Sequence, residues 1–240
     1  FAKGYELVKS LDPLRPVQYE RAEFEPHTDI LCPMYWDPAT CEKYVQSDPY
    51  RPLIQCEYAH AMGNAVGSIK EYWDSARNAK NNNFLGGFIW VWADQSRFRA
   101  IDDILPNKLV TGNTYDYYSE EFARQNLYKD ENNGKFFSYG GDNGDVTTET
   151  NFCVCGIVSP DREVQPEIYE VKYQYQNFWF NKTTEDDIAN ECVWAYNESS
   201  FDNLNKFDVV YELYEDGKLL GSGKVDNVNI GPRETGELYV

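Results

Sequence analysis

The sequence between Pro52 and Trp92 predicts a strand, a helix and a second strand in succession. The run Pro52–Cys56 is short and apolar, which is typical of a strand buried on both faces. From Ala65 to Asn78, apolar side chains recur at three- and four-residue steps and predict a helix with one apolar face. A second apolar run, Phe88–Trp92, predicts the next strand. Apolar strands joined through a helix indicate a parallel βαβ unit and hence an α/β fold.

The flanking sequence extends this pattern. Tyr5–Leu11 has helical spacing and is followed by Asp12-Pro13, which predicts the tail of a helix. Two short apolar runs, Pro16–Tyr19 and Thr28–Pro33, predict further buried strands. Residues 97–135 are polar, have no clear period and predict a long loop or insertion.

The character of the sequence changes after a short helix predicted beyond Pro166. The segment Phe207–Tyr214 alternates between apolar and polar residues, and an Asp216-Gly217 turn leads into Lys218–Val225, which predicts a β-hairpin. We therefore expect two domains: residues 1–175, related to the α/β unit, and residues 176–240, an antiparallel β-sandwich.

Charge and apolar content exclude several classes of function. The formal net charge of -18 disfavours nucleic acid and anionic membranes as partners, because both require clustered Lys and Arg. No segment approaches the roughly 20 apolar residues needed to span a bilayer. The six cysteines are too sparse for a disulfide framework, and Cys153-Val-Cys155 lacks the spacing of a zinc site.

Glu57 is the first candidate for chemistry. It directly follows the apolar run Pro52–Cys56, so its carboxylate emerges at the carboxyl end of a buried strand, where barrel enzymes place catalytic groups. Tyr58, His60 and Asn64 add a hydroxyl, an imidazole and an amide, which are groups that bind sugar hydroxyls and orient a carboxylate.

The segment Arg51–Asn64 resembles the nucleophile segment of the large β-galactosidases of glycoside hydrolase family 2. The similarity covers nearly the whole chain apart from the insertion at about residues 97–135, and it includes Leu11–Glu20, Asp29–Tyr35, Gly86–Ser96 and Tyr139–Asp145. The resemblance implies the C-terminal half of a (β/α)8 TIM barrel, strands five to eight, followed by an immunoglobulin-like sandwich.

By this resemblance, Glu57 is the nucleophile of a retaining hydrolase and Tyr35 donates the hydrogen bond that orients it. His60 and Trp90 are expected to contact the galactosyl unit, with Asn64 as a further substrate-binding residue. These roles suit the residue types, because a phenol stabilises an ionised carboxylate and an indole face packs on a sugar ring. We expect the neighbouring Trp92 to be a core residue.

A retaining mechanism needs a second carboxyl about 5 to 5.5 Å from the nucleophile. The resemblance places this acid/base, together with magnesium ligands, upstream of residue 1, although Glu20 and Glu23 have the right residue type. The backbone carbonyl of Phe152 matches a sodium ligand of the family. A second sodium ligand, an asparagine in the family, is Cys155 here, and a thiol is a poor ligand for a hard cation.

The leading hypothesis is therefore a fragment of an enzyme that hydrolyses terminal β-D-galactosides through a covalent glycosyl-Glu57 intermediate. A β-glucuronidase or β-mannosidase of the same family is the alternative. A third hypothesis is a non-catalytic sugar-binding or structural module, because the isolated chain lacks an acid and is expected to be inactive. Half a barrel exposes sheet edges, so we expect dependence on the missing N-terminal part of the parent chain, or a homo-oligomer.

Overall fold

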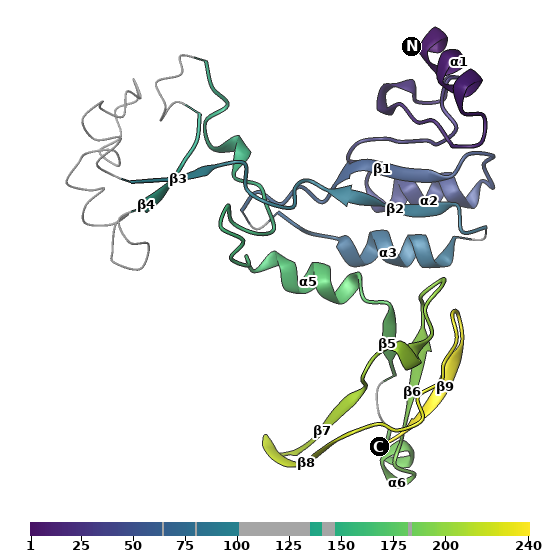
Figure 1. Cartoon of the computed structure of the whole chain (residues 1–240), viewed down its shortest axis with the longest axis vertical. Coiled ribbons are helices and arrows are strands. Elements are labelled where there is room, and N and C mark those ends of the chain that lie inside the picture. The colour runs from purple at the N-terminus through teal and green to yellow at the C-terminus, as the bar shows by residue number, and fades with distance from the viewer. Residues whose placement is uncertain (64, 80, 101–134, 141–146, 182–183) are drawn as a thin grey trace. The chain divides into compact units, whose positions relative to one another are not determined.

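The computed structural model describes residues 1–63, 65–79, 81–100, 135–140, 147–181 and 184–240. The chain divides into two compact units, Phe1–Gln174 and Tyr175–Val240. The first unit combines helices with a parallel strand pair and an antiparallel strand pair, whereas the described sheets of the second are all antiparallel (Figure 1).

The first unit contains the predicted parallel strand–helix–strand arrangement. Strand β1 (Leu53–Tyr58) pairs with β2 (Phe84–Ile89) in parallel, and helix α3 (Ile69–Asn78) lies between them in sequence. The two strands approach each other closely at Gly87, because a Cβ at this position would lie 2.8 Å from the ring of Tyr58. The second strand begins four residues before the predicted run, because Phe84 is the buried residue that pairs with Leu53.

Parallel pairing continues on both sides of this unit through isolated bridges. Leu31 pairs with Leu53, and Met34 pairs with Glu57. Beyond β2, Ala93 pairs with Val158. Successive segments are therefore joined in parallel, and the described residues form no closed barrel.

Two of the predicted strands do not form as strands. Thr28–Pro33 supplies only the isolated bridge at Leu31, and Pro16–Tyr19 forms no strand. The reason is that hydrogen bonds to Asp29 replace the hydrogen bonds that a neighbouring strand would make with Val17. The Val17 N–H donates to Asp29 Oδ2 at 2.8 Å, and the Val17 carbonyl accepts from the Asp29 N–H at 2.8 Å, so one residue satisfies both backbone groups.

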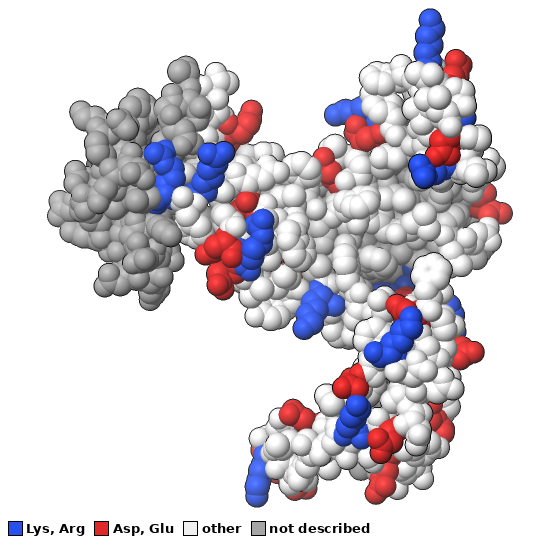
Figure 2. Space-filling view, viewed as in Figure 1, with Lys and Arg blue, Asp and Glu red and all other residues white. Residues whose placement is uncertain are grey.

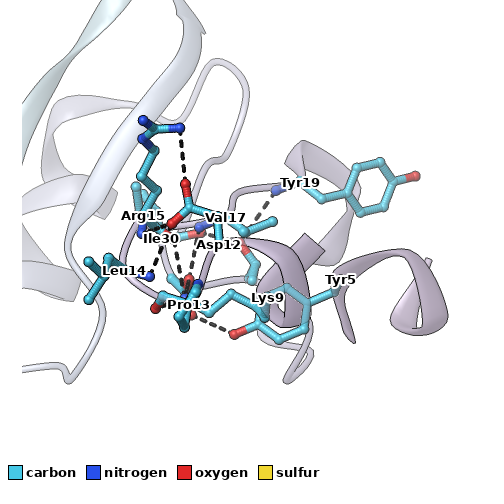
Figure 3. Close-up of polar contacts among 11 residues, drawn as sticks. Tyr5, Lys9, Asp12, Pro13, Leu14, Arg15, Val17, Tyr19 and Ile30 are labelled. Carbon is cyan, nitrogen blue, oxygen red and sulfur yellow. Dashed lines mark hydrogen bonds and ion pairs between the residues drawn. The ribbon is translucent and has the colours of Figure 1, made fainter. Parts of the chain in front are cut away.

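The same carboxylate attaches the N-terminal helix α1 (Ala2–Leu11) to this segment. Tyr5 Oη donates to Asp29 Oδ1 at 2.6 Å, and Lys9 Nζ donates to Asp29 Oδ2 at 3.1 Å. Tyr5, Lys9 and Val17 are labelled in Figure 3. The helix ends at Leu11, before Asp12, as predicted, and it buries none of its residues.

Helix α2 (Pro38–Gln46) was not predicted from the sequence. Its apolar spacing is weak, but its start has a recognisable signal, because Asp37 accepts from the Thr40 N–H at 3.0 Å and Pro38 occupies the first turn. One apolar cluster joins α2, α3, β1 and β2, and it comprises the buried residues Leu31, Cys41, Val45, Leu53, Ala79 and Phe84.

A second cluster joins α3 to α5 (Glu167–Gln174), the predicted short helix. It comprises the buried residues Ala61, Ile69, Ile157 and Val171. Short 3-10 helices occur at Glu20–Ala22 and Thr150–Cys153.

The predicted loop at 97–135 is wrong at its two ends. Strand β3 (Arg97–Ala100) pairs antiparallel with β4 (Lys135–Ser138), and Ala100 faces Lys135 across the pair. The rest of that prediction, residues 101–134, lies outside the described residues.

In the second unit, β5 (Phe178–Phe180), β6 (Cys192–Asn197) and β9 (Thr235–Tyr239) form an antiparallel sheet. The predicted hairpin is confirmed: β7 (Val210–Glu215) and β8 (Lys218–Lys224) pair through Asp216 and Gly217, which have φ of 49° and 76°. Helices α6 (Glu185–Ala189) and Leu204–Lys206 lie between the strands in sequence. An apolar cluster comprises Ala195, Leu204, Val225, Ile230 and Leu238. The immunoglobulin-like assignment stays a prediction.

The described surface carries both charge and exposed apolar side chains. Lys and Arg are interspersed with Asp and Glu over the face that Figure 2 shows. Near the N-terminus, Phe1, Leu7, Leu11 and Leu14 are 83%, 60%, 78% and 91% exposed. Within the described residues, no helix has the length and apolar character needed to cross a membrane.

Candidate active site at the carboxyl end of strand β1

Glu57 lies near the carboxyl end of β1, beside the segment that carries Tyr35. Tyr35 Oη donates to Glu57 Oε2 at 2.8 Å, and the Tyr35 N–H donates to the Glu57 carbonyl at 2.9 Å. The two residues are therefore joined through both side chain and backbone. A phenol in contact with a carboxylate lowers the energy of the ionised carboxylate, which is the form that a nucleophile requires.

Tyr35 is held as a hydrogen-bond donor. Burial of the phenol raises the pKa of Tyr35 well above its ordinary value, and the hydrogen bond to Glu57 raises it further. The side chain nevertheless keeps 40% of its surface exposed, so a ligand can reach it. Its backbone has φ of 53°, in the left-handed region that non-glycine residues rarely adopt.

The residue after Tyr35 is fixed by a buried amide. Gln55 is 0% exposed, and its Oε1 accepts from the Trp36 N–H at 2.7 Å. Gln55 Nε2 donates back to the Trp36 carbonyl at 3.1 Å, and Tyr72 Oη donates to the same carbonyl at 2.8 Å. Sequence reasoning missed Gln55. A polar side chain at an inward position of an apolar strand was the available signal.

His60 lies beside the Tyr35 ring, at a centroid distance of 6.1 Å, and beside the Phe152 ring at 5.3 Å. Its Nδ1 accepts from the Met62 N–H at 3.4 Å. Its Nε2 is buried and has no hydrogen-bond partner among the described residues. Among the described residues, none competes with a ligand hydroxyl for this nitrogen. Asn64, the other predicted substrate-binding residue, lies outside the described residues.

Trp90 lies directly after β2, and its backbone is joined to the segment after Glu57. Its N–H donates to the Tyr58 carbonyl at 3.2 Å, and its carbonyl accepts from the Ala61 N–H at 2.8 Å. The peptide bond between Trp90 and Val91 is cis. The expectation that Trp92 is a core residue is wrong, because its side chain is 60% exposed.

Asp94, which is 7% exposed, connects the segment after β2 to the segment that follows Phe152. Its Oδ1 accepts from the Gly156 N–H at 2.7 Å, and its Oδ2 accepts from Gln165 Nε2 at 2.9 Å. Gly156 is required by space, since a Cβ there would lie 2.1 Å from the Asp94 nitrogen. This carboxylate therefore has a structural role, and sequence analysis singled it out only as part of a longer motif.

Cys155 occupies the position where the family resemblance places an asparagine ligand of the sodium ion. The thiol is 1% exposed, and burial raises its pKa, so it is a neutral sulfur rather than an oxygen ligand. Sodium prefers oxygen donors, and the carbonyl of Phe152 alone does not make a site. The residues present do not fit a sodium ion here. Among the residues that the structure describes, no three His, Cys, Asp or Glu side chains gather as a metal-binding group.

The Glu20 and Glu23 carboxylates lie on the first 3-10 helix and its end. Glu20 Oε2 pairs with Arg21 Nε at 2.9 Å, and the Glu23 residue is exposed. Burial raises the pKa of the Cys56 thiol, and the charges of Glu20 and Glu57 raise it further.

Comparison with known sequences supplies the family. The family model described as glycosyl hydrolases family 2, TIM barrel domain, matches residues 1–120 and 108–180. Similar curated relatives are β-galactosidase 2 of Enterobacter cloacae, 35% identical over 92% of this chain, and the β-galactosidase of Pseudoalteromonas haloplanktis, 31% identical over 98%. The β-galactosidase of Halalkalibacterium halodurans is 34% identical over 97% of this chain.

These relatives are much longer than the chain, which spans 19%, 21% and 19% of their respective lengths. Among solved structures, a β-glucuronidase of Faecalibacterium prausnitzii is similar over 72% of this chain and 27% of its own, with 16% identity and a TM-score of 0.38. Likeness at this level gives no information about the substrate.

Proposed function

This chain belongs to glycosyl hydrolases family 2, and we propose that the protein hydrolyses terminal β-D-galactosides with retention, with Glu57 as the nucleophile. The hydrogen bond from Tyr35 to Glu57 at 2.8 Å, at the carboxyl end of a parallel strand, is the observation that carries the proposal. The three β-galactosidase relatives support galactose as the sugar.

In the first step, a Glu57 oxygen attacks the anomeric carbon while the bond from that carbon to the leaving oxygen breaks. A carboxylic acid protonates the leaving oxygen, and a glycosyl ester of Glu57 results. Tyr35 orients the Glu57 carboxylate before the attack, through the hydrogen bond it donates. In the second step, water attacks the same carbon, gives up a proton to the acid/base carboxylate, and releases Glu57.

The acid/base is a second carboxyl, and we assign it to a part of the protein beyond this chain. Retaining hydrolases need it about 5 to 5.5 Å from the nucleophile. Glu20, the nearest alternative by residue type, is already engaged in an ion pair with Arg21 at 2.9 Å. The resemblance implies magnesium beside the acid/base, and we propose that its ligands lie in the same part of the protein as the acid/base.

Sugar recognition is assigned to His60, Trp90 and Asn64. His60 Nε2 has no hydrogen-bond partner in the part of the chain that the structure describes, and it suits a hydrogen bond to a sugar hydroxyl. Trp90 is partly exposed, and its indole suits the apolar face of a pyranose. Asn64 would add an amide that donates and accepts.

The architecture proposed for the whole protein follows from the family. Residues 1–175 would form strands five to eight of a (β/α)8 barrel with an insertion, and residues 176–240 an immunoglobulin-like sandwich. The exposed apolar residues near α1, such as Leu11 and Leu14, suit contact with the first half of the barrel or with another copy in a homo-oligomer.

The test is release of nitrophenol from the p-nitrophenyl β-galactoside, β-glucuronide and β-mannoside by the protein in its full natural length. We expect turnover of the galactoside that the Glu57→Gln variant loses, by about 10⁴-fold or more, because a neutral amide cannot replace the attacking carboxylate. Preferred turnover of the glucuronide or mannoside would identify the alternative members of the family. No turnover of any of the three, with intact binding of galactose, would identify a non-catalytic module.

A further inference from the structure

We propose that Gln55 is a positioning residue, which holds Tyr35 in contact with Glu57 by fixing the backbone of Trp36; the inference rests on the proposed role of Glu57. Gln55 does not touch the Glu57 carboxylate in any contact described above. Its effect passes through the chain segment that carries Tyr35.

Both polar atoms of the Gln55 side-chain amide bond to the backbone of one residue, Trp36. Its oxygen accepts from the Trp36 N–H at 2.7 Å, and its nitrogen donates to the Trp36 carbonyl at 3.1 Å. On the other side, the Tyr35 N–H donates to the Glu57 carbonyl at 2.9 Å. The backbone of this segment is therefore bonded to β1 at Tyr35 and at Trp36. These bonds fix the backbone from which the Tyr35 side chain extends relative to Glu57.

Tyr35 needs such support for two reasons. Its φ of 53° is unfavourable for a residue with a Cβ, so the surrounding structure must hold it. Its side chain is 40% exposed, so packing alone does not fix its position. A hydrogen bond to a nucleophile is useful only when the donor is held in the correct geometry before the substrate arrives.

Packing does not explain an amide at position 55. The side chain is 0% exposed in a strand whose neighbour on the same face, Leu53, is apolar and equally buried. A leucine or methionine would fill a similar volume without the cost of burying an amide. The two bonds to Trp36 are what an apolar side chain could not supply. Tyr72 Oη donates a further hydrogen bond to the Trp36 carbonyl at 2.8 Å, and so helps to hold the same backbone.

The experiment is a double-mutant cycle in the full-length protein, with kcat and KM measured on p-nitrophenyl β-galactoside. The variants are Tyr35→Phe, Gln55→Leu and the two combined. Removing a hydrogen bond to a charged group should lower kcat about 10- to 100-fold in Tyr35→Phe. Gln55→Leu should lower kcat by a smaller factor, with little change in KM, and an unchanged kcat in this variant would overturn the proposal.

The combined variant decides the question. If Gln55 acts through Tyr35, the combined variant has the kcat of Tyr35→Phe alone, within about 2-fold. If Gln55 is only a structural residue, the two losses multiply, and the proposal is overturned. Gln55→Met enters the same cycle should Gln55→Leu fail to fold, because methionine follows the shape of glutamine and lacks the amide.

Asn197 offers a matched control. It is also 0% exposed, and its Nδ2 donates to the carbonyls of Asp202 and Ile230 at 2.8 and 3.0 Å. Asn197→Leu should lower thermal stability, and any loss of kcat should multiply with that of Tyr35→Phe. Failure of the proposed function is seen separately, since Glu57→Gln would then leave turnover unchanged or the wild type would show none.

Discussion

Replacing Asp29 with Asn should loosen helix α1 and the segment around Val17 in a pH-dependent way. The carboxylate accepts from Tyr5 at 2.6 Å, from the Val17 N–H at 2.8 Å and from Lys9 at 3.1 Å. The hydrogen bond from Tyr5, followed by that from Val17, lowers the pKa of Asp29 from 3.8 to about 2.

The size of the effect follows from this shift. A folded pKa of about 2 against an ordinary value of 3.8 corresponds to about 2 kcal/mol of preference for the folded, ionised form. Because the side chain is 29% exposed, solvent screening reduces the expected loss in Asp29→Asn to about 1–2 kcal/mol at pH 7. The folded pKa is depressed, so this stability is fully present well above the ordinary pKa of 3.8 and is lost as pH falls through about 2.

The assay is hydrogen exchange with mass spectrometry on peptides that cover residues 1–30, corrected for the intrinsic pH dependence of exchange. We expect the opening free energy of these peptides to fall in Asp29→Asn at pH 7, while peptides from the second unit keep their protection. The difference between wild type and variant should shrink as the pH is lowered from 5 toward about 2. A difference that is the same at neutral and acidic pH would refute the reasoning, because the loss would then not come from the charge.

Three further outcomes follow from the structure. Gly156→Ala should destabilise the protein by about 3 kcal/mol or more, measured as loss of soluble, protease-resistant protein, because its Cβ would lie 2.1 Å from the Asp94 nitrogen. Exchanging sodium for choline at constant ionic strength should leave kcat/KM for galactoside hydrolysis unchanged; a fall that lithium or potassium fails to restore would disprove the sodium mismatch at Cys155. Cys32 and Cys41, whose pKa burial raises to about 12, should resist iodoacetamide at pH 8 and react only after denaturation in urea, as measured by mass spectrometry.

The sequence predicted the elements whose signals are local. The spacing of apolar residues before Asn78 and the run before Glu57 identified α3 and β1, because helix and strand periodicity survive in a single segment. The Asp216-Gly217 turn identified the hairpin for the same reason. These features need no knowledge of distant contacts.

The errors occur where a distant side chain decides the local structure. Pro16–Tyr19 reads as a strand, but the carboxylate of Asp29 takes the place of a neighbouring strand. Helix α2 was missed because its apolar pattern is weak, although the capping residue Asp37 precedes it. The burial predicted for Trp92 failed because strand alternation does not extend past the end of β2.

Knowledge of the candidate site had two sources. The pairing of Tyr35 with Glu57 was expected from a family resemblance, since residues 22 positions apart carry no local signal for contact. A polar residue within an apolar strand signals that Gln55 has a buried partner, but no residue pattern identifies that partner as the Trp36 backbone on another segment.

The antiparallel pairing of β3 with β4 has a consequence for how members of this family can diverge. Ala100 and Lys135 face each other, so the chain leaves the scaffold and returns to it at one point. The entropy cost of closing an insertion grows only slowly with its length. Evolution can therefore lengthen, shorten or replace residues 101–134 while the register of β1 and β2 stays the same. The strand that carries Glu57 need not change when this segment does.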